Sequence, residues 1–157
     1  LTGHLVLATL HTNDAASAMT RLADMGVEPY LLASSLLGVL AQRLVRTLCP
    51  ACRTEAAPTQ GEATLLAELG LPQDMRLHAP AGCGECRDTG YRGRSGIYEL
   101  IVVDDALRRL IHDRAPEHAL RAAAARAGTT SLRHDGARWL ANGTTSLAEL
   151  VRVSREA

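Results

Sequence analysis

The sequence contains no lysine and no phenylalanine, and its single tryptophan is Trp139. Because every side chain with a fixed positive charge is an arginine, chemistry that needs an amine is excluded. This includes a phosphate-binding loop of the G-x-x-x-x-G-K-[ST] type, whose lysine reaches the terminal phosphates of a nucleotide. Because aromatic residues make up only 3 % of the chain, any core must be built from leucine, valine and alanine.

A long apolar run and an excess of charge of one sign are also missing. The longest apolar run, Leu36–Ala41, has six residues, whereas a helix that crosses a membrane needs about 20. The 17 basic and 17 acidic residues balance, which argues against the basic footprint of a nucleic-acid-binding sleeve. Hydrophobic residues at 46 % and charged residues at 22 % are typical of a globular protein and exclude a disordered tail.

The first residues predict a fragment that begins within a strand. The chain starts without methionine and without a charged-then-apolar leader, so we expect a piece of a protein that is not secreted. Residues 3–11 are a mostly apolar run, typical of a strand that is buried on both faces in a parallel sheet. The polar cluster Thr12–Asp14 then predicts the N-cap of a helix over residues 14–25, which Gly26 ends.

The rest of the chain is predicted to be mainly helical. Pro29 suits a first helical position, and apolar residues follow at three- and four-residue steps up to Cys49, namely Leu32, Leu36, Val39, Leu40 and Leu44. We then expect a short helix over residues 62–69 and a strand over residues 96–103. From residue 104 onward four helices are predicted, whose caps or first residues are Asp104, Pro116, Ser131 and Ser146. Ser146 and Glu149 also fit a capping box.

The four cysteines occur as two C-x-x-C pairs in a segment rich in glycine and proline. Two such pairs are what a tetrahedral structural zinc site needs, because each tight turn presents two thiolates on one side. The alternatives are two disulfides, which a reducing cytosol disfavours, and a site that has lost its metal. We therefore predict one structural, non-catalytic Zn²⁺ bound by Cys49, Cys52, Cys83 and Cys86.

Nucleic-acid binding is a competing use of such a zinc module. From Cys83 to Glu99 three arginines are balanced by three acids, and the aromatic residues are Tyr91 and Tyr98. This neutral stretch offers too little charge and stacking surface for a nucleic acid. It fits protein contact or bracing of the chain itself better.

Two histidines, His4 and His11, bracket the predicted opening strand. Positions seven apart in a continuous strand lie on opposite faces and roughly 23 Å apart, so the two cannot share a ligand unless the strand ends before His11. His11 would then lie at the carboxyl end of a buried strand, the edge at which open α/β sheets bind ligands. The alternative is a histidine that forms hydrogen bonds across loops.

Several motifs in this order resemble the secretion and pilus ATPase superfamily. They are the histidine box at residues 1–15, the segment Gln42–Arg46, the two C-x-x-C pairs, and residues 90–100 and 144–150. The sequence is similar to the type II secretion ATPase, the E component, and more distantly to the type IV pilus assembly ATPase. The pilus retraction ATPases lack the four-cysteine module and are disfavoured.

The resemblance implies an α/β fold. It implies the C-terminal part of a RecA-like P-loop ATPase domain, followed by a mainly helical subdomain with a small four-cysteine zinc-binding insertion. Residues 1–48 would hold the end of the RecA-like core and the first helices of the helical subdomain. Residues 49–99 would form the zinc-binding module, and residues 100–157 the C-terminal helical subdomain.

The resemblance also implies an activity and its cofactors. In the family, the Walker A loop, an acidic box and the Walker B segment precede the histidine box, so this chain would be inactive alone. His11 and His4 would lie near the terminal phosphate, and the four cysteines would be the zinc ligands. The full-length protein would bind ATP and Mg²⁺ and would couple ATP hydrolysis to protein secretion through pseudopilus assembly.

The implied protein is a homohexamer that lies in the cytoplasm, peripheral on the inner membrane. Its partners would be inner-membrane secretion-platform proteins, with no nucleic acid and no transmembrane segment. The alternatives are a type IV pilus assembly ATPase and a zinc-braced adaptor domain with no nucleotide role. A phosphate-binding loop upstream of Leu1 would favour the motor over the adaptor.

Overall fold

The structure, a computed structural model, describes residues 3–154 and has a mixed α/β fold. Leu1 and Thr2, the first residues of the histidine-box motif, lie outside the described residues. None of the helices within residues 3–154 is long and apolar enough to cross a bilayer. The helices are α1 (Ala15–Asp24), α2 (Pro29–Ser35), α3 (Gln60–Glu68), α4 (Asp105–His112), α5 (Glu117–Arg126), α6 (Leu132–Ala141) and α7 (Leu147–Val153). The strands are β1 (Gly38–Leu48), β2 (Thr54–Ala56), β3 (Leu77–Ala79) and β4 (Tyr91–Val102), and η1 (Gly84–Cys86) is a 3₁₀ turn.

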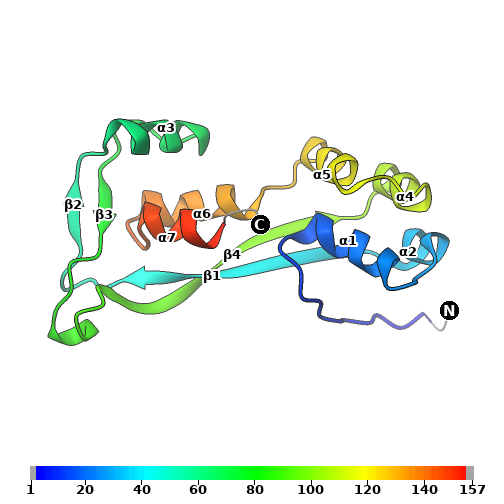
Figure 1. Cartoon of the computed structure of the whole chain (residues 1–157), viewed down its shortest axis with the longest axis horizontal. Coiled ribbons are helices and arrows are strands. Elements are labelled where there is room, and N and C mark those ends of the chain that lie inside the picture. Colours follow the sequence, from blue (N-terminus) through cyan, green and yellow to red (C-terminus); the bar gives the residue numbers. More distant parts are fainter. Residues whose placement is uncertain (1–2, 155–157) are drawn as a thin grey trace. The chain divides into compact units, whose positions relative to one another are not determined.

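Two sheets of two strands each are present within the described part of the chain (Figure 1). The long strands β1 and β4 pair with each other. The amide of Val103 donates to Leu37 O (3.0 Å) and that of Cys49 to Gly90 O (2.9 Å), so the two strands run antiparallel. The short strands β2 and β3 are also antiparallel, with Glu55 opposite His78.

The chain divides into two compact units, and both long strands pass from one unit into the other. The first unit comprises residues up to Ala41 together with Leu100–Thr129, and contains α1, α2, α4 and α5. In it α2 packs against α4, and α1 against α5. The buried core of this unit is aliphatic, as the composition predicts: Ala15, Ala16, Met19, Leu32, Ile101, Val103, Leu107, Ile111, Leu120, Ala123 and Ala124.

The second unit comprises Gln42–Glu99 and the residues from Thr130 onward. It contains α3, α6, α7, the small sheet and all four cysteines. Helix α6 approaches α7 closely at Gly136, where an added Cβ would lie 2.2 Å from the Cδ1 atom of the fully buried Leu150. A glycine at this position therefore sets the spacing of the two helices.

The predicted helix starts are confirmed in all the C-terminal helices. Asp104, Ser131 and Ser146 are N-caps whose side chains accept the amide three residues later, and Pro116 is the N-cap of α5. The predicted strand over residues 96–103 forms the second half of β4. The short helix expected at residues 62–69 begins two residues earlier, at Gln60, because Thr59 and Glu62 form a capping box.

The predicted helix from Pro29 to Cys49 is wrong beyond Ser35. The helix ends there, and residues 38–48 form β1. Leucines spaced three and four apart fit a helix, but the same segment also places Val39 and Val45 on alternate positions that face inward. Pairing with β4 provides hydrogen-bond partners for the backbone N–H and C=O groups of this segment, which therefore forms a strand.

The predicted buried strand over residues 3–11 is also wrong in this structure. These residues form neither helix nor strand, and their side chains are exposed, with Leu7 at 90 %. A strand buried on both faces needs neighbouring strands and covering layers. Neither of the two sheets within residues 3–154 includes this segment, so nothing there holds it as a strand.

Candidate metal centre and histidine-box segment

Each C-x-x-C pair closes on itself in a tight turn. After β1, the amides of Cys52 and Arg53 both donate to Cys49 O, at 3.3 and 3.0 Å. In the second pair, the amides of Cys86 and Asp88 donate in the same way to Cys83 O, at 3.2 and 2.9 Å. In both turns the carbonyl of the first cysteine therefore accepts the amide of the second, three residues later.

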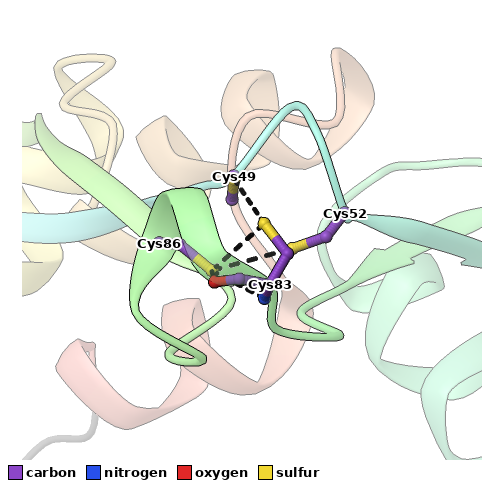
Figure 2. Close-up of side chains that lie close together, drawn as sticks. All are labelled: Cys49, Cys52, Cys83 and Cys86. Carbon is purple, nitrogen blue, oxygen red and sulfur yellow. Dashed lines mark hydrogen bonds between the residues drawn. The ribbon is translucent and has the colours of Figure 1, made fainter.

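The four cysteine side chains converge on one point between the two turns (Figure 2). Their Sγ atoms all lie within 4.8 Å of one another. The Cys49–Cys83 pair is 4.0 Å apart, and the Cys52–Cys86 and Cys83–Cys86 pairs are 3.8 Å apart. Four sulfurs bound tetrahedrally at about 2.3 Å from a zinc ion would be about 3.8 Å from one another. All four cysteines are free, and these distances are far longer than a disulfide bond of about 2.05 Å.

Backbone amides point at two of the sulfurs. The Gly82 amide donates to Cys52 Sγ at 3.3 Å, and the amides of Cys83 and Gly90 donate to Cys86 Sγ, each at 3.2 Å. Burial works against ionisation of Cys86, but these two amides lower the pKa of its thiol to about 6. Burial and the neighbouring thiols raise the pKa of Cys52 to about 11. Backbone amides thus stabilise the thiolate of Cys86, whereas ionisation of Cys52 is disfavoured unless a positive charge lies nearby.

Glycine is required at two positions around the second turn. Gly82 has φ +103° and Gly90 has φ +73°, a region that other residues rarely adopt. A Cβ on Gly82 would lie 2.9 Å from Asp88 O, and one on Gly90 would lie 2.3 Å from the Pro80 side chain. The glycines let the backbone approach closely enough for the amides to reach the sulfurs.

These observations fit a metal ion with four sulfur ligands. The set contains no carboxylate or histidine and leaves no ligand position for water or substrate, so the ion would cross-link the two turns and would not take part in a reaction. The surrounding contacts extend this cross-link. The amide of Cys49 donates to Gly90 O, and the Arg53 guanidinium donates to Gly143 O at 2.7 Å, which connects the first turn to the residue before β4 and to the loop after α6.

A buried carboxylate, Glu149 on α7, forms a second cluster that sequence reasoning missed. Its side chain is fully buried and accepts the Arg46 amide (3.1 Å) and guanidinium (2.7 Å). Arg152, three residues later on the same helix, donates to both carboxylate oxygens at 2.7 and 2.8 Å. Burial opposes ionisation, but these arginines lower the pKa of Glu149 to about 2.

The expected capping box at Ser146 is therefore only half correct. Ser146 Oγ accepts the Glu149 amide, but the Glu149 carboxylate is directed to arginines instead of returning to the cap. Tyr91 completes this cluster, because the Arg46 guanidinium lies 4.0 Å from its ring centroid and its hydroxyl lies 2.8 Å from Ser146 Oγ. The i, i+3 spacing of Glu149 and Arg152 was the signal in the sequence that could have indicated the pair.

The two predicted histidines lie on the exposed segment before α1. Both His4 and His11 have exposed side chains, and neither is part of a strand. His11 is three residues before Asp14, the N-cap of α1. The structure thus places His11 next to a helix start, as predicted, but without the buried strand end that was expected to carry it.

Asp14 anchors the end of this segment through hydrogen bonds to two separate partners, Ser17 and Arg121. Its Oδ1 accepts the Ser17 amide at 2.8 Å, and its own amide donates to Ser17 Oγ, which is a complete capping box. Its Oδ2 accepts a hydrogen bond from the Arg121 guanidinium of α5 at 2.9 Å. Sequence reasoning identified the cap but not the arginine, because the two residues are 107 positions apart.

Comparison with known proteins places the chain. The family model described as "Type II/IV secretion system protein" matches residues 1–152. The chain belongs to this family. The type II secretion system protein HxcR of Pseudomonas aeruginosa is 57 % identical over the whole chain, and the type II secretion system ATPase E of Vibrio cholerae is 53 % identical over 99 % of it. The type IV pilus assembly ATPase TfpB of Acinetobacter baylyi is 48 % identical over 98 % of the chain.

These relatives of the type II/IV secretion family are much longer than the chain. The chain spans 30 % of HxcR, 31 % of the Vibrio ATPase and 26 % of the pilus ATPase. The match nevertheless extends over both units of the fold and includes the histidine-box segment and the four cysteines. The resemblance seen in the sequence is thereby confirmed at the level of the family.

Proposed function

We propose that this chain is the C-terminal part of a motor ATPase that powers type II protein secretion, through pseudopilus assembly, by hydrolysing ATP. The observation that carries the proposal is the 53 % identity to a type II secretion system ATPase over 99 % of the chain. The complete protein would bind ATP and Mg²⁺ through segments that precede the histidine box. It would act as a homohexamer in the cytoplasm, peripheral on the inner membrane and in contact with the secretion platform there.

The mixed α/β fold supports the proposed place of the chain in such a motor. Residues 1–48 would end the RecA-like ATPase core and begin the helical subdomain, residues 49–99 would be the metal-binding module, and residues 100–157 the C-terminal helical subdomain. The apolar side chains of the exposed segment agree with this, since Leu5, Val6 and Leu7 are 74–90 % exposed in the chain by itself. Covering them with the rest of the core would bury surface that is unfavourable in water.

A structural Zn²⁺ is proposed at the four cysteines. Its support is the S···S spacing of 3.8–4.0 Å and the amides directed at Cys52 and Cys86. The thiolates would hold the ion, and the positive charge of the ion would favour the ionised form of its sulfur ligands. Its binding energy would then contribute to the folding of this module.

His11 is proposed to act on charge that develops at the terminal phosphate of ATP. Its exposed ring, three residues before the capped start of α1, is free of the core packing that a purely structural histidine would have. His4 is proposed to lie in the same site with a smaller contribution. Since His11 lies just before the N-cap of α1, a change at the phosphate would be passed to this helix.

The test is turnover by the complete protein with His11→Ala. A group that acts in the transition state should, when removed, lower kcat by about 10²-fold to 10³-fold while nucleotide affinity changes little. His112→Ala is the matched control, since His112 is an exposed histidine on α4 of the same unit. Normal turnover per folded molecule in His11→Ala would contradict the proposed role of the histidine.

The 157-residue chain by itself should neither bind ATP tightly nor hydrolyse it. It has no lysine and therefore no phosphate-binding loop of the required type. Steady hydrolysis by the isolated chain, above that of its His11→Ala variant, would contradict the proposed location of the active site. Complete inactivity of the full-length protein, with no nucleotide binding, would favour the adaptor alternative.

A type IV pilus assembly ATPase is the second candidate, favoured by the 48 % identity to the pilus ATPase of Acinetobacter baylyi. Deletion of the gene in its own host separates the two. Loss of secreted enzymes with normal pili would support the secretion motor, and loss of pili with normal secretion would support the pilus motor.

A further inference from the structure

The carboxylate of Asp14 connects the histidine-box segment to a helix far along the chain. Its two oxygens have separate tasks: Oδ1 accepts the Ser17 amide and caps α1, and Oδ2 accepts the Arg121 guanidinium of α5 at 2.9 Å. The Asp14 side chain is only 14 % exposed, so this ion pair is partly shielded from water. Shielding strengthens the attraction between the two charges compared with a surface pair.

The ion pair is built on a rigid base. Helices α1 and α5 pack through small side chains, with Ala15 and Ala16 of α1 in the same buried cluster as Ala123 and Ala124 of α5. The Arg121 guanidinium is also held by Glu117, one turn earlier on α5. The Glu117 contact restricts the Arg121 side chain, so less side-chain entropy is lost when Arg121 pairs with Asp14.

Both Asp14 and Arg121 are ionised at neutral pH, as the pKa shifts of the two groups indicate. Burial raises the pKa of Asp14, but the hydrogen bonds from the Ser17 amide and from Arg121 outweigh this and hold the pKa below its usual range. Burial lowers the pKa of Arg121, but the hydrogen bonds and charges of Asp14 and Glu117 raise it overall. Both groups are charged at neutral pH, so the pair persists under working conditions.

The histidine-box segment is exposed up to His11 and forms side-chain hydrogen bonds from Thr12 onward. Residues 3–11 are exposed and form neither helix nor strand, whereas from Thr12 onward the chain is tied down, with Thr12 Oγ1 donating to Asp14 O and Ser17 Oγ to the same oxygen. His11 is the residue directly before this anchored turn. The position and direction of its ring at the end of the segment depend on how firmly the turn is held.

We propose that Arg121 is a positioning residue for His11, which it fixes by clamping the Asp14 turn onto α5. This rests on the proposed role of His11 at the terminal phosphate. Arg121 would not touch the nucleotide; it would hold the turn from which His11 extends. Because a displacement of about 1 Å can cost a large factor in rate, loosening the turn should reduce turnover with little effect on nucleotide binding.

The experiment measures kcat and KM of the complete ATPase with Arg121→Gln. We expect kcat to fall about tenfold and KM for ATP to change by less than about twofold, because an effect on orientation acts mainly on the transition state. Arg121→Lys should recover much of the loss, since an ammonium can still pair with Asp14. The matched control is Arg126→Gln, an exposed arginine in the last turn of the same helix, which should leave kcat unchanged.

Asp14→Asn tests the same pair from the other side. Asparagine keeps a side-chain oxygen for the Ser17 amide, so the cap survives, but the charge that holds Arg121 is lost. It should match Arg121→Gln in kcat, and the double variant should be no slower than either single one. A kcat for Arg121→Gln equal to that of Arg126→Gln would overturn the proposal, whatever the melting temperatures of the two variants.

A comparison with His11→Ala separates this proposal from the one on which it rests. If Arg121 acts through His11, adding Arg121→Gln to His11→Ala should lower kcat no further. Multiplied losses in the double variant would mean that Arg121 acts independently, and the positioning role would be wrong while that of His11 stands. Normal turnover of His11→Ala would instead refute the role of the histidine itself, and with it the positioning role of Arg121.

Discussion

Replacement of Glu149 by glutamine should destabilise the second unit more than any other single loss of charge in it. The carboxylate is fully buried on α7, where it accepts the amide and guanidinium of Arg46 and two bonds from Arg152. An amide keeps one acceptor but carries no charge. The arginines would then face a group that no longer compensates them, and one amide hydrogen would point at a donor.

The magnitude follows from the pKa. The value for Glu149 falls from 4.5 to about 2, which corresponds to about 3 kcal/mol of stabilisation at neutral pH. The side chains of Arg46 and Arg152 are 45 % and 60 % exposed, so water screens part of this interaction and can solvate both charges in the variant. We therefore expect Glu149→Gln to lower the free energy of unfolding by about 2 kcal/mol.

The assay is urea denaturation followed by the fluorescence of Trp139. This is the single tryptophan of the chain, and it lies in the same unit as Glu149, with its indole N–H bonded to Gly96 O at 2.9 Å. The matched control is Glu55→Gln, which removes an exposed ion pair with Arg76 in that unit and should cost less than about 1 kcal/mol.

The difference in the free energy of unfolding between the original chain and Glu149→Gln should depend on pH. A carboxyl whose pKa is lower in the folded than in the unfolded chain stabilises the fold above its unfolded pKa, near 4.5 for Glu149. This contribution is lost as the pH falls toward about 2. The difference between the original chain and Glu149→Gln should be equal at pH 7 and pH 5.5 and should shrink below pH 4.5. A difference no larger than that of Glu55→Gln at pH 7 would refute the reasoning.

Two further predictions concern the metal centre and the packing of the helices. Protein purified without added zinc should contain one zinc per chain by metal analysis. Cys83→Ser should lose the zinc, and hydrogen exchange should then show residues 49–99 loosening first. Four titratable thiols without metal in the original chain would show that the site is vestigial. Gly136→Ala should lower stability by about 1–3 kcal/mol, because the new methyl group meets the side chain of Leu150. Gly61 is a helical glycine with open space around it, so Gly61→Ala should instead raise stability by up to about 1 kcal/mol. If the two substitutions changed the melting temperature equally, the close packing at Gly136 would be contradicted.

Helix starts, and the turns that carry the four candidate metal ligands, could be predicted from the sequence because both depend on neighbouring residues. Asp14, Asp104, Ser131 and Ser146 each bond an amide three positions later, so the cap and its partner lie in one short stretch. The C-x-x-C turns are local in the same way. Their chemistry then limits the options, since four sulfurs within 4.8 Å of one another suit a metal ion that binds thiolates, of which Zn²⁺ is one.

The state of residues 38–48 was decided only by the tertiary structure. The leucines of this segment fit a helix, and the alternation of Val39 and Val45 fits a strand. Local periodicity alone could not choose between the two. The choice was made by β4, about 50 residues further along the chain, which supplies the hydrogen bonds of a strand. In residues 3–11 the opposite occurred: the strand pattern is present, but the two sheets described here do not include it.

The charged clusters likewise became visible only when distant residues met. The sequence alone indicates that Glu149 belongs to a capping box, but in the structure it binds Arg46, which is 103 positions away. The sequence likewise indicates only a helix cap at Asp14, which in the structure also binds Arg121, 107 positions away. A buried carboxylate is tolerated only where opposite charges and amide donors surround it, and the sequence does not show which residues the fold will bring there. Short-range hydrogen bonds thus determined the helix starts and the cysteine turns. The long-range pairing of strands and charges determined the strands β1 and β4 and the anchoring of the histidine-box turn, because their partners are neighbours only in space.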